Sequence, residues 1–241
     1  MRRPTGRAVS AFFAIPDSEP IPLRVRPRLA SWMARGHPDQ VGLAVFLDHA
    51  ESAIEGDLES IDAPVALKLD VGLPSSVDPL KHHDLDNYLY PLLARLGPRR
   101  FASAWATKQV SDTSSIRADR ARPVDPPQQV TIFHVTTTHS AESVAWKQEV
   151  QGQLVGATEI SDGPVELELS FRVSPSRSWA NLWKPAIDSL SPILGSERGR
   201  PWNPRDGRVV RLGLHHVVDR SLGHGVEILI AASVLGRRES P

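Results

Sequence analysis

The residues best suited to chemistry are two aspartates, Asp84 and Asp86, in a motif that reads His-His-Asp-Leu-Asp-Asn over residues 82–87. Carboxylates at i and i+2 share a face only where the backbone is extended, and we expect such a backbone just before a helix capped by Asn87. Two converging carboxylates without a cationic partner suit a hard divalent ion. The motif is therefore a candidate Mg²⁺ site, with Asp84 and Asp86 as the ligands. The alternative is structural: Asp86 and Asn87 cap the helix, and Asp84 interacts with its dipole.

The elements around this motif occur twice in the chain. Residues 62–69 and 162–169 both place a turn-forming Asp and Pro before alternating apolar residues, which predicts a half-buried strand. Residues 87–96 and 181–190 share the pattern Asn-x-x-x-Pro-x-(Leu/Ile)-x-x-Leu, where x is any residue. Apolar side chains at i, i+3, i+4 and i+7 in both segments predict amphipathic helices. We interpret the repeat as a duplication; two unrelated strand–helix units with common turn chemistry are the alternative.

The proline-rich stretch at 122–127 is the expected join, since consecutive prolines forbid a helix and interrupt a sheet. It predicts two units, 1–122 and 123–241. Each helix is followed by a Gly, an arginine-bearing loop and a Trp (Trp105, Trp202), so we align these tryptophans. In the second unit we expect strands at 129–135, 165–173, 209–218 and 226–235, and helices at 141–154 and 181–194. The predicted fold class is α/β (α+β), a small mixed sheet covered by helices and present twice.

An Asp-Leu-Asp-Asn motif that opens a Leu-rich helix, after a strand beginning Pro-Val, resembles the RusA-type Holliday junction resolvases. These are small dimeric endonucleases of about half this length. The family motif reads Asp-Leu-Asp-Asn-Leu-x-Lys-x-x-x-Asp-x-Leu, with a third carboxylate in a later Trp…Asp-Asp segment. Residues 181–190 keep two parts of this motif: Asn-Leu-x-Lys, which includes Lys184, and x-Asp-x-Leu. The segment 202–210, which includes Asp206, is similar to the family's late acidic segment. The resemblance implies Asp84, Asp86 and Asp206 as catalytic acids, with Mg²⁺ as cofactor.

Each half departs from the family pattern in a complementary way. Ser178–Asn181 replaces the two early acids in the second half, and no carboxylate follows Trp105 in the first. In the dimeric family each site resembles one assembled within a subunit, so completion of Asp84 and Asp86 by Asp206 requires a different arrangement. We therefore expect a pseudo-dimer on one chain, monomeric in solution, that binds branched or structured DNA with nuclease activity weak or lost. The alternatives are an active Mg²⁺-dependent structure-selective endonuclease and a non-catalytic protein–protein scaffold.

Basic side chains after the two helices are candidates for contacts with backbone phosphates. The candidate nucleic-acid residues are Arg99, Arg100, Lys184, Arg205 and Arg208, with Arg198 and Arg200 in the same loop. Ordinary solvated loop arginines are the alternative. Among the tryptophans, Trp183 lies on the apolar stripe of its helix and is expected in the core, whereas Trp179 is the better candidate for stacking on unpaired bases. His215 and His216 are neighbours in a predicted strand and should point to opposite faces.

The composition excludes several classes of function. The 241 residues hold 28 Lys+Arg and 28 Asp+Glu, so no global positive field draws the chain to nucleic acid, and any such binding needs a local patch. The absence of Cys excludes disulfides, Cys-ligated zinc and a thiol nucleophile. No apolar run approaches the roughly 18 residues of a membrane span, so we expect a cytoplasmic protein without membrane contact. Neither a nucleotide-binding Gly-rich loop nor a G-x-S-x-G elbow is present.

Overall fold

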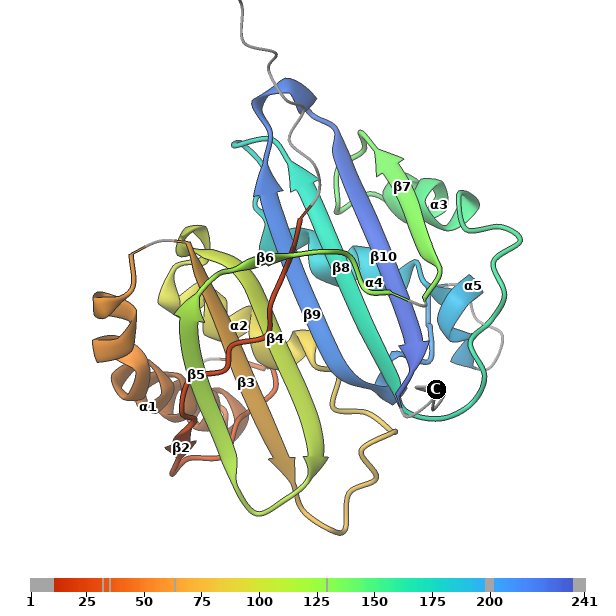
Figure 1. Ribbon diagram of the computed structural model, residues 1–241. Helices are drawn as coiled ribbons and strands as arrows, with labels where there is room; N and C mark the ends of the chain where they lie inside the picture. Colours follow the sequence, from red (N-terminus) through yellow and green to blue (C-terminus); the bar gives the residue numbers. More distant parts are fainter. Residues whose placement is uncertain are drawn as a thin grey trace, which may run out of the picture.

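The structure, a computed structural model, describes residues 11–31, 33–34, 36–62, 64–128, 130–197 and 202–235. Its centre is an eight-stranded mixed sheet with the strand order β2-β5-β3-β4-β9-β8-β10-β7 (Figure 1). These strands are β2 (Ile21–Leu23), β3 (Val65–Leu73), β4 (Phe101–Val110), β5 (Ser114–Arg120), β7 (Ile132–Thr137), β8 (Val165–Val173), β9 (Val209–Val218) and β10 (Val226–Val234). A short pair, β1 (Phe12–Phe13) with β6 (Pro123–Val124), lies apart from this sheet.

The helices are α1 (Pro38–Ser60), α2 (Asp86–Leu96), α3 (Val144–Gly152), α4 (Trp183–Asp188) and α5 (Ser191–Leu194). Short 3₁₀ turns are η1 (Pro98–Arg100), η2 (Trp179–Leu182), η4 (Asp206–Arg208) and η5 (Arg220–Leu222). Strands β8 and β9 have the predicted bounds. The helix predicted over 181–194 is instead divided among η2, α4 and α5, because Pro192 near the start of α5 lacks the N–H that a continuous helix requires. Ser143 caps α3 by accepting a hydrogen bond from the Trp146 N–H.

The helices and the β1–β6 pair lie on opposite faces of the sheet. In the view of Figure 1, α1, α2 and α4 lie behind the strands, and β1 and β6 cross in front. The helix side holds the main core, to which α2 contributes Leu89, Leu92 and Leu93, and α4 contributes Trp183 and Ile187. This burial confirms both predicted apolar stripes and the core position of Trp183.

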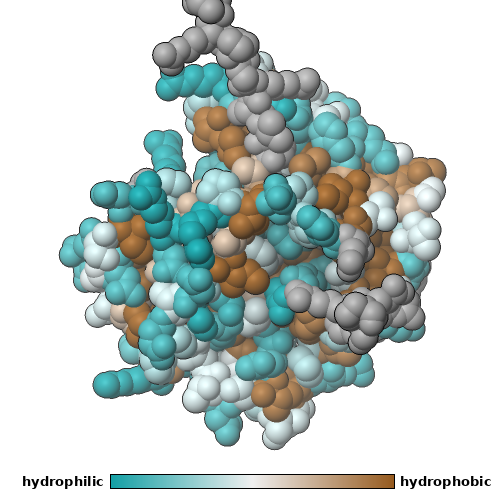
Figure 2. Space-filling view, viewed as in Figure 1, coloured by the Kyte–Doolittle hydropathy of each residue, from teal (hydrophilic) through white to brown (hydrophobic). Residues whose placement is uncertain are grey.

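The face crossed by β1 and β6 is mixed in character. Ala66 packs there in a small apolar cluster with Phe13. Further along β3, the Asp70 carboxylate pairs with Lys68 at 2.9 Å and with Arg117 at 2.8 Å. Hydrophobic and hydrophilic side chains are correspondingly interspersed on this face (Figure 2). The alternation along β3 thus buries one side of the strand and leaves ion pairs on the other.

The strand pairings of the first half recur in the second. Strands β3 and β4 are parallel with a register shift after Val65, and β8 and β9 are parallel with a shift after Val165. Each of these pairs is flanked by an antiparallel strand, β5 beside β3 and β10 beside β8, and then by an edge strand, β2 or β7. The fold is therefore a mixed α+β structure with one large mixed sheet and helices, which confirms the coarse fold class.

The two halves of the sheet meet in the antiparallel pairing of β4 with β9. Trp105 lies opposite Gly213 in this ladder, and a Cβ on Gly213 would lie 2.7 Å from Cζ3 of the Trp105 ring. Register also corrects the predicted tryptophan alignment. Lys68 and Glu168 occupy the same place in the two repeats of the strand. Lys68 pairs with Trp105, and Glu168 pairs with Gly213. The counterpart of Trp105 is therefore Gly213 and not Trp202, which precedes β9. Within the described part of the chain, no helix combines the length and apolar character needed to cross a membrane.

Gly213→Ala tests the close approach of Trp105 to the β9 backbone. The added methyl group overlaps the indole, so we expect a loss of about 1–3 kcal/mol in the free energy of unfolding, measured by chemical denaturation. Gly56→Ala is the matched control, since its Cβ in α1 meets nothing within 4 Å. It should stabilise the protein by about 0.5–1 kcal/mol. A Gly213→Ala variant as stable as the unsubstituted protein would contradict the packing described here.

Candidate functional site

The acidic motif lies between β3 and α2. Leu85 is buried, as expected for a residue turned inward between two acids, and Asp86 is 4% exposed. The helix begins at Asp86 and not after Asn87, and Leu85 already has helical backbone angles. The predicted cap at Asn87 is therefore wrong: the Asn87 amide instead donates to the Asp84 carboxylate at 3.3 Å. The backbone at Leu85 and Asp86 is thus helical and not extended, so the geometric reason for expecting the two acids to share a face is wrong.

The second half contributes three further charged groups to this region. Asp206 is the first residue of η4, directly before β9. The Lys184 ammonium on α4 lies 3.4 Å from Oδ2 of Asp206 and 3.1 Å from Oδ1 of Asp188, one helical turn further along. Asp188 also pairs with Lys147 of α3 at 2.6 Å. Lys184 is half-exposed, whereas the carboxylates of Asp188 and Asp206 are largely buried.

The acids of the two halves form one electrostatic group, which we name the acidic cluster: Asp84, Asp86, Asp188 and Asp206. Burial raises the pKa of Asp86 to about 6; the charges of Asp84 and Asp188 act in the same direction, and Lys184 opposes them. Burial and the charge of Asp84 also raise the pKa of Asp206 well above its usual range, with further contributions from Asp86 and Asp188. The three predicted catalytic acids are therefore close enough to influence one another's protonation.

Lys108 of β4 joins the two loops that carry these acids. Its ammonium donates to the carbonyls of His82 at 2.9 Å, His83 at 3.1 Å and Gly207 at 2.7 Å. Both histidines have positive φ, 58° and 56°, a conformation that non-glycine residues rarely adopt. Burial lowers the pKa of Lys108 to about 8, although Asp84, Asp206 and Asp86 act in the opposite direction. Sequence analysis missed Lys108; the available signal was that Lys108 continues the alternate positions of Ala104 and Ala106, which form a buried face of β4.

The predicted nucleic-acid residues have different surroundings. Arg99 and Arg100 are exposed in η1, and Arg100 donates one hydrogen bond to the Leu58 carbonyl. Arg205 is partly exposed and pairs with Asp162 at 2.7 Å. Arg208 is 4% exposed and donates to the carbonyls of Ile160 and Ser161, so its predicted phosphate contact is corrected to a structural role. Arg198 and Arg200 lie outside the described residues.

Trp179 is buried, which contradicts its predicted role in stacking on unpaired bases. It is 3% exposed, and its indole N–H donates to the Pro98 carbonyl at 3.2 Å. Its ring stacks on His216 with centroids 4.4 Å apart. His215 points to the other face and accepts a hydrogen bond from the Phe13 N–H, so the prediction of opposite faces is confirmed.

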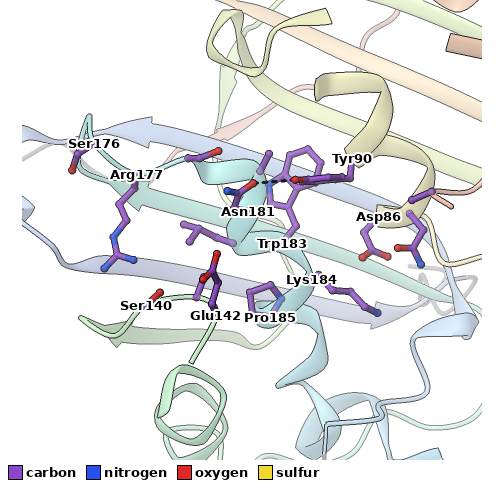
Figure 3. A pocket seen from close by; sticks show the side chains of 16 residues that line it. Asp86, Tyr90, Ser140, Glu142, Ser176, Arg177, Asn181, Trp183, Lys184 and Pro185 are labelled. Carbon is purple, nitrogen blue, oxygen red and sulfur yellow. Dashed lines mark hydrogen bonds between the residues drawn. The ribbon is translucent and has the colours of Figure 1, made fainter. Parts of the chain in front are cut away.

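A pocket of about 550 Å³ adjoins the acidic cluster between α2 and the η2–α4 segment. Asp86 and Lys184 lie at one end of this pocket and Arg177 at the other (Figure 3). Along its wall, the Tyr90 hydroxyl donates to the Asn181 side-chain oxygen at 3.3 Å. Of the acidic cluster, Asp86 lines this pocket, beside Lys184.

The donor chemistry of the cluster fits a hard divalent cation. Its four carboxylates are opposed by Lys184, Lys108 and Lys147, so one negative charge remains if every acid is ionised and every lysine is charged, and oxygen is the ligand that Mg²⁺ prefers. Across the described ranges, however, no group of three or more His, Asp or Glu side chains has the spacing of a metal site. In this arrangement the Lys184 ammonium lies beside the carboxylates and supplies part of the neutralising charge.

Comparisons with known proteins add little to this geometry. No protein-family model and no curated protein matches the chain. A weakly similar solved structure is described as "Cyanuric acid hydrolase: evolutionary innovation by structural concatenation", with 14% identity over 76% of this chain and a TM-score of 0.21. The match covers 64% of that chain, less than two thirds of its length. A TM-score this low supports no conclusion about fold or activity, so the function is argued from the site itself.

Lys108→Met tests whether the ammonium holds the two acidic loops together. The variant leaves three inward carbonyls without their donor, and we expect the free energy of unfolding to fall by about 2–4 kcal/mol in chemical denaturation. The control is Lys81→Met in the same loop, where the side chain is 76% exposed. That change should have an effect within about 0.5 kcal/mol. Equal stabilities of the two variants would contradict the joining role of Lys108.

Asp86→Asn should change stability in a pH-dependent way in metal-free buffer. A carboxyl with a raised folded-state pKa stabilises the fold while protonated, and that contribution is lost as the pH rises from about 4 through about 6. The free energy of unfolding of the variant, relative to that of the unsubstituted protein, should therefore rise by up to about 3 kcal/mol between pH 4 and pH 8. Urea titrations at each pH measure this difference. Asp112→Asn, at a 98% exposed carboxylate, is the control and should show no such trend. If the difference in unfolding free energy between Asp86→Asn and the unsubstituted protein did not change with pH, the raised pKa of the buried Asp86 carboxyl would be refuted.

Proposed function

We propose that this chain is a single-chain counterpart of a RusA-type dimer that binds branched DNA and cleaves it at one Mg²⁺-dependent site, the acidic cluster. The observation that supports the proposal is that Lys108 joins the loop that carries Asp84 and Asp86 to the turn that carries Asp206, through the carbonyls of His83 and Gly207. The sequence predicted weak or lost cleavage because neither half by itself holds all three acids. Across the two halves all three acids are present, on segments that Lys108 joins, and their charges influence one another's protonation.

The mirrored topology supports the pseudo-dimer part of the proposal. A twofold axis through the β4–β9 pairing relates the strand order β2-β5-β3-β4 to β7-β10-β8-β9. The turns before the central strands correspond in the same way, because η1 precedes β4 and η4 precedes β9. Their last residues, Arg100 and Arg208, each donate to a carbonyl in the segment before β3 or β8. Such repeated detail favours duplication over two unrelated units.

The residues of the cluster have distinct proposed roles. Asp84 and Asp86 would hold Mg²⁺, which supplies charge neutralisation and a more acidic water when bound, and Asp206 is the proposed third acid. Lys184 is half-exposed at the end of the pocket and would donate to the oxygens of a DNA phosphate bound there. Lys108 fixes the two loops relative to each other and does not contact substrate. Arg99 and Arg100, exposed beyond α2, are available for backbone phosphates.

A second candidate is a DNA-binding protein of the same architecture whose nuclease activity is weak or lost. The position of Lys184 favours it, because an ammonium beside Asp188 and Asp206 already supplies part of the charge that a cation would bring. Metal binding must then displace that ammonium, which weakens the affinity for Mg²⁺. The two candidates share the fold and the DNA and differ only in cleavage.

Asp206→Asn tests cleavage directly. We expect the unsubstituted protein to cut a four-way DNA junction with Mg²⁺, and the variant to cut about 10³-fold more slowly, because about 4 kcal/mol of transition-state stabilisation is lost. The measurement is single-turnover cleavage of end-labelled junctions, with Asp125→Asn in the segment after β6 as the control. Equal product from the unsubstituted protein and Asp206→Asn would end the nuclease proposal.

Binding is measured separately, because it distinguishes the two candidates from a protein–protein scaffold. The affinity for the junction should exceed that for linear duplex, and its logarithm should fall linearly with the logarithm of salt concentration. Binding without cleavage selects the non-cleaving form. No binding to either DNA at low salt overturns the nucleic-acid assignment, and a dimeric mass in solution contradicts the single-chain pseudo-dimer.

A further inference from the structure

The pseudo-twofold axis assigns every member of the acidic cluster a counterpart position. The segment Asp84–Asp86 corresponds to Ser178–Ala180, since each immediately precedes the shared Asn of the helix motif. On the helices, Lys184 and Asp188 correspond to Tyr90 and Ala94. Asp206, first in η4, corresponds to Pro98, first in η1. Among these counterparts there is no carboxylate and no ammonium.

The counterpart position is filled by packed aromatic side chains. Trp179, which replaces Leu85 between the two former acid positions, bonds to the Pro98 carbonyl of the other half. Its ring lies between His216, at 4.4 Å, and Trp183, at 4.7 Å. By strand register His216 is the counterpart of Lys108, and burial lowers its pKa to about 4, which leaves it neutral. Trp179 and Ala180 are both buried, and Ser178 and Ala180 line the same pocket as Asp86, so this position differs from the acidic cluster in its lack of charge and not in its access.

We infer that the chain has one cleavage site per molecule where a symmetric dimer has two, and that it nicks a single strand of a branched DNA in each binding event. The inference rests on the proposed function and specifies the product of the cleavage, a single nick. In each nick a water oxygen bonds to phosphorus and one backbone P–O ester bond breaks. A cluster carboxylate accepts the proton of the water, and the departing oxygen takes a proton from solvent, so one water is consumed per nick.

The test uses a supercoiled plasmid that extrudes a cruciform, with the full chain, Mg²⁺ and an excess of unlabelled junction added after binding to prevent a second encounter. One site predicts nicked circles without linear DNA. It also predicts that Asp86→Asn lowers nicking at least about 100-fold, because no second site exists to sustain it. Asp112→Asn, at a 98% exposed carboxylate outside the acidic cluster, should nick like the unsubstituted protein.

Each other result is decisive. Linear plasmid formed within one binding event shows two sites and overturns this inference while the proposed nuclease stands. Nicking retained by Asp86→Asn places a second site elsewhere and also overturns it. No product of any kind from the unsubstituted protein overturns the proposed cleavage and this inference together. Manganese titration followed by electron paramagnetic resonance gives a readout apart from activity: binding removed by Asp86→Asn supports one site, and binding unchanged refutes it.

Discussion

The antiparallel pairing of β4 with β9 is the interaction on which the rest of the structure depends. It joins the two halves into one sheet, and the Trp105 ring packs where Gly213 has no side chain. Because η4 leads directly into β9, this register also decides where Asp206 lies relative to Asp84 and Asp86. A slip of two residues would move η4 by about 7 Å along the strand. The acidic cluster would then not form.

The acidic cluster lowers the stability of the folded protein through electrostatic repulsion. Carboxylates held close together at low exposure disfavour each other's ionisation, which explains the raised pKa values of Asp86 and Asp206. Lys184 offsets part of this repulsion through direct ion pairs, and Lys108 acts mainly by holding the backbone of both loops. Strained, charged arrangements of this kind concentrate at functional sites, where a ligand can relieve them. Without a ligand, the protein tolerates the repulsion because the surrounding sheet and helices fix the loops.

The two related positions differ in their side chains. One holds charged groups, and at the other an indole packs across the seam against Pro98 and His216. Burying an aromatic ring stabilises the fold, whereas clustering acids costs stability. A single chain can support both outcomes because its halves mutate independently, which identical subunits cannot do. Under the proposed duplication, the covalent link between the halves permits this asymmetry.

The sequence by itself determined the local elements: alternation predicted β8 and β9, and apolar spacing placed Leu89 and Trp183 in the core. These signals depend on neighbours along the chain, so composition and period suffice. Only the tertiary structure decided that Asp206 joins Asp84, that Trp179 is buried and that Arg208 is structural, while the family resemblance and its DNA remain predictions. Those outcomes depend on contacts between residues roughly one hundred positions apart, which strand register and side-chain packing set and no local pattern encodes.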